Sequence, residues 1–74
     1  MNKERRNKIA GIIGELNIIK EGLDEIRDDE QYSFDSMPEN LQGSYNGSLA
    51  EEAIEIMDEA LDHIDESISL LEGI

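Results

Sequence analysis

The chain of 74 residues contains no cysteine, no tryptophan and a single proline. Without cysteine, neither a disulfide framework nor a thiolate zinc site is available. A chain of this length lies near the size at which one hydrophobic core contributes only a few kcal/mol, so small domains usually add a disulfide, a metal or self-association. The sequence therefore favours oligomerisation as the device that completes its core.

Lys and Arg are absent after Arg27. All six lie within the first 27 residues, although the chain carries nineteen Asp and Glu and a net charge of -13. Because such a surface repels phosphates and anionic lipids, we expect no direct nucleic-acid binding and no membrane binding. The first residues lack the apolar run of a secretory signal, and no stretch approaches the roughly 20 apolar residues of a spanning helix. These patterns predict a cytoplasmic protein.

Groups suited to chemistry are also scarce. The sequence has no Gly-rich phosphate loop, nucleophile elbow or calcium-binding loop. Its one histidine, His63, follows Ala60 by three residues, so the Glu-x-x-His motif of di-iron bundles is missing. Three interpretations of His63 stay open: a packed interface residue, a pH-sensitive contact or a ligand. We expect no catalytic residue, no cofactor, no metal and no enzymatic activity.

Residues 48–73 predict one amphipathic helix. Its apolar residues recur with a period of about 3.5 when Ile54 is heptad position a. Positions a and d hold Ala50, Ile54, Met57, Leu61, Ile64, Ile68 and Leu71. A second apolar row occupies positions c and g, which hold Leu49, Ala53, Ile56, Ala60, His63, Ser67 and Leu70. Because one partner helix covers only one row, we predict that the c/g row joins a second copy of the chain.

Residues 3–35 predict a second long helix. Its a and d positions hold Ile9, Ile12, Leu16, Ile19, Leu23 and Ile26. Three of the four e positions of this helix are basic, and every e position of the helix over 48–73 is acidic. Positions e face each other when two helices run antiparallel. The predicted ion pairs join Arg27 to Glu51, Lys20 to Asp58 and Arg6 to Glu72. The fold class is therefore all-α: an antiparallel helical hairpin that assembles as a dimer or higher oligomer into a helix bundle.

A connector over residues 36–47 joins the two helices. Ser36 with Glu39 forms a capping box, which predicts a short helix over 38–42. Asn46-Gly47 predicts a turn, and Ser48 predicts the N-cap of the second long helix.

The connector and the residues just before it gather all three aromatic residues of the chain. We predict that Phe34, Met37, Leu41 and Tyr45 form a cluster that closes the open end of the hairpin. The alternative is a recognition loop, because loops on rigid scaffolds often carry binding. The candidate partner-binding residues are Tyr32, Phe34, Asp35, Met37, Pro38, Asn40, Leu41 and Tyr45.

The run from Phe34 to Ser44, FDSMPENLQGS, resembles a group of short acidic proteins encoded by phages and prophages of Firmicutes-type bacteria. The likeness covers nearly the whole chain, and this eleven-residue run is its specific part. In that group a charged pair usually follows the serine, where this chain has Tyr45-Asn46. The resemblance implies a small phage accessory protein that acts on host machinery, defence systems included.

Three functions follow as hypotheses. The first is an inhibitor that binds a host protein stoichiometrically, acting as a homodimer or higher oligomer. The second is a nucleic-acid mimic, because carboxylates from Glu51 to Glu72 recur about every 3.7 Å along the helix, close to the roughly 3.4 Å phosphate spacing of one DNA strand. The acidic face available for mimicry consists of Glu52, Glu55, Glu59, Asp62 and Glu66. The third is an oligomer that sequesters a small nucleotide signal with Arg5, Arg6 or Lys8 meeting across a subunit boundary.

Overall fold

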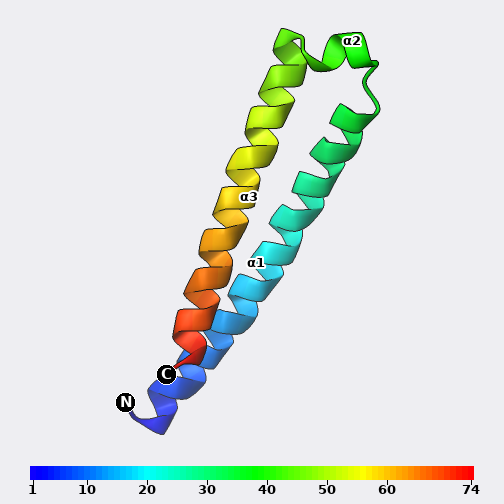
Figure 1. Cartoon of the computed structure of the whole chain (residues 1–74). Coiled ribbons are helices and arrows are strands. Elements are labelled where there is room, and N and C mark those ends of the chain that lie inside the picture. Colours follow the sequence, from blue (N-terminus) through cyan, green and yellow to red (C-terminus); the bar gives the residue numbers. More distant parts are fainter.

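The computed structural model describes all 74 residues as three helices and no strand. The helices are α1 (Lys3–Asp35), α2 (Glu39–Gln42) and α3 (Tyr45–Glu72). The two long helices run side by side in opposite directions, α2 spans one end of the hairpin, and both termini lie at the other end (Figure 1). The result is a rod of 58 × 15 × 13 Å. None of the helices combines the length and apolarity needed to cross a membrane.

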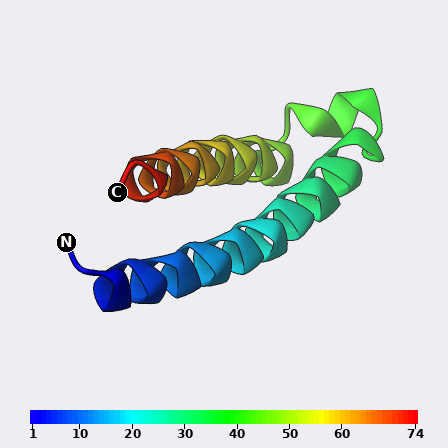
Figure 2. The same ribbon diagram turned by 90° about the horizontal axis from the view of Figure 1, so that it is seen from below.

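Helix α1 has the bounds that its sequence predicts. Asn2 caps its start, because the Asn2 Oδ1 accepts a hydrogen bond of 2.8 Å from the backbone N–H of Arg5. At the other end the Ser36 N–H donates to the carbonyl oxygens of Tyr32 and Phe34. The helix curves gently along its length (Figure 2). A Cβ added to Gly11, Gly14 or Gly22 would meet nothing within 4 Å, so these glycines mark no close approach within the chain.

Helix α3 begins three residues before its predicted start. Ser44, and not Ser48, is its N-cap, and the Ser44 Oγ accepts a hydrogen bond of 3.3 Å from the Gly47 N–H. The predicted turn at Asn46-Gly47 is therefore wrong, since both residues lie in the first turn of α3. The reason is tertiary: Gly47 is buried where the end of α2 meets the start of α3, close to the Gln42 carbonyl.

The core lies almost entirely on one side of α3. Four side chains are 5–8 % exposed, and α1 contributes no buried residue. Those four are Ala50, Ile54, Leu61 and Ile68. Three of them are at position a, so the predicted heptad phase of α3 is confirmed by its burial. One neighbouring helix can cover one stripe of α3, and the rest of its circumference stays in contact with solvent.

Helix α1 is rotated from the orientation that its a and d positions predict. The d residues Ile12, Ile19 and Ile26 are 50–60 % exposed. The row that faces α3 instead combines positions a and e, whose half-buried members include Ile9, Ile13, Leu16, Lys20, Leu23 and Arg27. The rotation brings the basic e residues Lys20 and Arg27 within reach of acids on α3.

The pairing of e with e is confirmed, but the predicted register is wrong by one heptad. Arg27 pairs with Asp58 and Lys20 pairs with Asp65, and no ion pair joins Arg6 to Glu72. Paired residue numbers therefore sum to 85 and not to the expected 78. The shift follows from the connector: α2 packs against the first turns of α3, so α3 extends beyond the end of α1 and the helices slide by two turns.

Candidate functional site

Two tyrosines near the connector are exposed to solvent. Tyr32, in the last turn of α1, is 76 % exposed, and Tyr45, the first residue of α3, is 78 % exposed. Leu41 of α2 is exposed as well. Phe34 and Met37 are half-buried, so the predicted cluster of four forms only in part. Leu41 and Tyr45 lie outside it, since Leu41 is 49 % exposed and Tyr45 is more exposed still. Asp35, Pro38 and Asn40 are exposed as well.

Gln42 holds the connector in one conformation. Its side-chain Nε2 donates to the carbonyl oxygens of Phe34 (3.3 Å) and Met37 (3.2 Å). These bonds tie the end of α2 to the end of α1. Phe34 also lines a hollow of about 230 Å³ together with Gln31, Glu51, Ile54 and Glu55. The connector is thus an ordered surface with aromatic side chains around it, which is a suitable composition for protein recognition.

Apolar side chains from both long helices lie exposed on one face of the rod. On α3, Leu49, Ile56 and Leu70 of the predicted c/g row are 46–70 % exposed. His63 and Ser67 are exposed too, whereas Ala53 and Ala60 are half-buried. The exposed d residues of α1 add Ile12, Ile19 and Ile26, which the sequence assigned to the contact within the hairpin. We call this set of exposed isoleucines and leucines the apolar face.

The ion pairs establish that the two rows share a face. Arg27–Asp58 and Lys20–Asp65 join position e of α1 to position e of α3, so both e flanks lie on one side of the hairpin. The flank of each helix that lies opposite its e positions is therefore on the other side of the hairpin. On α1 this flank is position d and on α3 it is positions g and c, and these positions make up the apolar face. The basic e row of α1 was the signal in the sequence that could have predicted this rotation.

His63 lies within the c/g row of α3, and its imidazole is near two acidic side chains of the same helix. Its Nε2 is 3.7 Å from the Glu59 carboxylate and its Nδ1 is 3.9 Å from that of Glu66. All three side chains are more than two-thirds exposed. No group of three or more His, Asp or Glu side chains lies close enough together to hold a metal ion.

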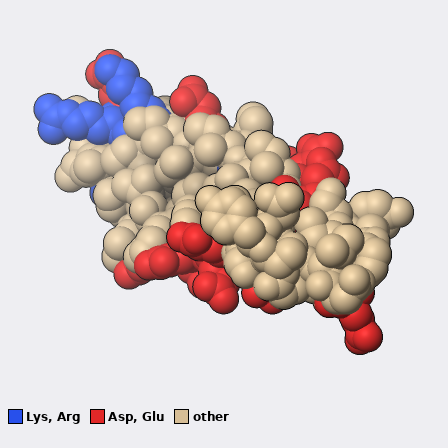
Figure 3. Space-filling model, turned by 90° about the horizontal axis from the view of Figure 1, so that it is seen from above, with Lys and Arg blue, Asp and Glu red and all other residues tan.

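The acidic face occupies another part of the α3 surface. Its members, Glu52, Glu55, Glu59, Asp62 and Glu66, are all exposed, and none forms an ion pair with Lys or Arg. Only Asp58 and Asp65 of the acidic e row are engaged by bases. Viewed from the connector end, acidic side chains lie at the edges of a broad surface without charge, and basic side chains gather at one corner (Figure 3).

The two cross-helix ion pairs differ in geometry. Arg27 binds Asp58 through two nitrogens, with Nε to Oδ1 at 2.7 Å and Nη2 to Oδ2 at 3.3 Å. This hydrogen-bonded carboxylate raises the pKa of Arg27. The hydrogen bond between Lys20 and Asp65 raises the pKa of Lys20 above its ordinary value of 10.5. These pairs fix which flank of each helix faces the other.

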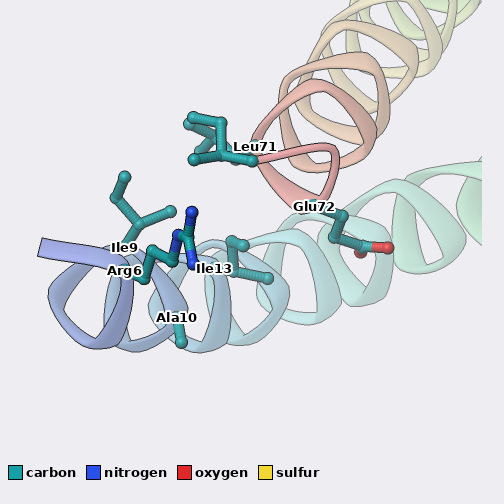
Figure 4. A pocket seen from close by; sticks show the side chains of 7 residues that line it. Arg6, Ile9, Ala10, Ile13, Leu71 and Glu72 are labelled. Carbon is teal, nitrogen blue, oxygen red and sulfur yellow. The ribbon is translucent and has the colours of Figure 1, made fainter. Parts of the chain in front are cut away.

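An open hollow of about 400 Å³ lies between the helix ends at the termini. Seven residues line it: Arg6, Ile9, Ala10, Ile13, Leu71, Glu72 and Ile74. The Glu72 side chain points away from Arg6 (Figure 4). The lining is mostly apolar with one base, and Arg5 and Lys8 do not contribute. A phosphate ligand would need further bases from a second copy, so the nucleotide-sequestering hypothesis stays a prediction.

Comparisons with protein families, with curated proteins and with solved structures find no match for this chain.

Proposed function

We propose that the chain acts without catalysis, as a self-associated helix bundle that binds another protein stoichiometrically. The observation that carries this proposal is the apolar face, because exposed isoleucines and leucines that share one face of two helices are typical of a protein interaction surface. In a single hairpin the apolar face is exposed to water. Burying apolar surface against protein lowers the free energy by about 25 cal/mol per Å².

The connector, together with the last turn of α1, is the surface that we assign to the partner protein. It presents Tyr32, Leu41 and Tyr45, and tyrosine is enriched at interfaces because it combines a large apolar ring with a polar tip. Gln42 orders the backbone before binding, which lowers the entropic cost of association. The resemblance to short acidic phage proteins adds the expectation that the partner is a host protein, inhibited in the cytoplasm of an infected cell.

Affinity capture from bacterial lysate with the tagged chain tests this assignment. A host protein should be retained in a fixed ratio by the wild type and lost with Tyr32→Ser/Tyr45→Ser. Ile18→Ser is the matched control, since Ile18 is exposed on α1 fourteen residues, or about 21 Å, before Tyr32 and so lies away from the connector end. If no protein is held at constant stoichiometry, or if the tyrosine variant holds it as well as the control does, the assignment fails.

Nucleic-acid mimicry is the second candidate. The exposed acids of the acidic face have no basic partner within the chain, so their charges are available to a DNA- or RNA-binding protein. Salt separates the two candidates, since exposed charge pairs are screened beyond a Debye length of about 8 Å at physiological ionic strength. Mimicry is supported if the host protein is no longer retained when salt is raised, and if it is also lost with Glu55→Gln/Glu59→Gln/Asp62→Gln. Retention that persists supports contact through the connector.

A further inference from the structure

We propose that the apolar face is covered by a second copy of this chain in antiparallel orientation, so that the basic end of each hairpin meets the acidic connector end of the other. The inference rests on the self-association proposed above and specifies its geometry. Two observations carry it: the area that one hairpin leaves exposed, and the distribution of charge along its long axis.

The exposed area matches the requirement of a dimer. A folded monomer of 8.3 kDa is expected to expose about 4,600 Å². This chain exposes 5575 Å², an excess of about 1,000 Å². A standard protein interface buries about 800 Å² from each partner. A second copy on the apolar face would thus bring the exposed surface of each chain to the value typical of its mass.

Charge separates the two ends of the rod. Lys3, Arg5, Arg6 and Lys8 lie at the end that holds the termini, and of these only Lys8 forms an ion pair, an exposed one with Glu4. The connector end is acidic on both helices and in α2, with Asp28, Asp29, Glu30, Asp35, Glu39, Glu51 and Glu52. Stacking two copies in parallel places like charges together at both ends, whereas antiparallel stacking places opposite charges together. Electrostatic complementarity of this kind sets orientation and suppresses the wrong arrangement.

The c/g row of α3 fits an antiparallel two-fold axis. In the observed register His63 of α3 lies level with Gly22 of α1, near the middle of the hairpin. An axis at this level stacks α3 on α3 of the partner copy, and the half-buried Ala60 beside His63 lets the two backbones approach. Ile56 and Leu70 lie seven residues on either side of His63. The axis therefore brings Ile56 of one copy to Leu70 of the other.

Engineered cysteines test this geometry, because the natural chain has none. Residues 56 and 70 lie about 21 Å apart on one helix, and a disulfide needs Cα atoms within about 7 Å, so a bond between them forms only between copies. Mixing Ile56→Cys with Leu70→Cys under mild oxidation should give a disulfide-linked pair on a non-reducing gel, while neither variant alone links to itself efficiently. His63→Cys, beside the axis, should link to itself.

Matched controls and a salt series separate the possible outcomes. Glu55→Cys mixed with Ser69→Cys has the same spacing on the b row of α3 and should give no linked pair. Arg5→Glu/Lys8→Glu should raise the dimer dissociation constant by about tenfold at low salt, and less at high salt. A chain that is dimeric but fails to link position 56 to position 70, or a dimer that the charge reversal leaves intact, overturns the antiparallel geometry alone. A chain that is monomeric overturns self-association as well.

Discussion

Gly47 is the residue on which the conformation of the connector most clearly depends. A Cβ at this position would lie 2.0 Å from the Gln42 carbonyl oxygen and 2.8 Å from that of Leu41. Both atoms are backbone, so they cannot move aside without displacing α2. The φ angle of Gly47 is not positive, and glycine is required here for close packing and not for a left-handed backbone.

Gly47→Ala should therefore destabilise the hairpin by about 1–3 kcal/mol, the cost typical of overpacking. Urea unfolding followed by circular dichroism measures the change. Gly14→Ala is the matched control, since a Cβ there meets nothing within 4 Å and the substitution gains helix propensity of about 1 kcal/mol. Equal stabilities for Gly47→Ala and the wild type would mean that α2 does not pack on the start of α3.

Lys20 gives the stability of the hairpin a dependence on alkaline pH. Its hydrogen bond to Asp65 raises its pKa in the folded state above 10.5, so the contribution is fully present below pH 10.5 and is lost as the pH rises through the folded-state pKa. The urea midpoint of the wild type should fall between pH 9.5 and a pH above that raised pKa. Lys20→Arg should show a smaller fall, because arginine keeps its charge in this range. An equal fall in both proteins would assign the effect to other groups.

At the scale of the elements, the sequence predicted which segments form helices but not how the helices face each other. The bounds of α1 and the heptad phase of α3 follow from local patterns: a capping residue, apolar spacing and acids at fixed positions. The register does not, because it depends on how α2 packs against Gly47. The exposed row on α1 was missed because Ile12 and Ile19 fit the a/d pattern as well as the true contact residues do, and only the basic e positions indicate the rotation of α1.

Charge reversal tests the observed register. Arg27→Glu places an acid opposite Asp58 and should lower the urea midpoint, because like charges then face each other across the hairpin. Adding Asp58→Arg should restore most of the loss. Adding Glu51→Arg should not, since Glu51 is the partner only in the register that the sequence predicted. Rescue by Glu51→Arg with none by Asp58→Arg would contradict the structure.

For the molecule as a whole, the central feature is incomplete burial. One hairpin buries four apolar side chains, all on α3, and exposes isoleucines and leucines on both long helices. With no cysteine for a disulfide, we propose self-association as the route by which so small a chain adds to its core. Tyr32 and Tyr45 are not among the residues of the apolar face, so the proposed dimer contact and the proposed partner contact use different side chains.

The mass of the purified chain in solution tests this account most directly. Light scattering coupled to size-exclusion chromatography should give at least twice the 8.3 kDa of one chain. Ile19→Glu/Ile56→Glu should reduce the mass to that of a single hairpin without loss of helix, because charges at the centre of the apolar face oppose its burial. A wild type that stays at 8.3 kDa over the whole concentration range, with its helices intact, would contradict the account.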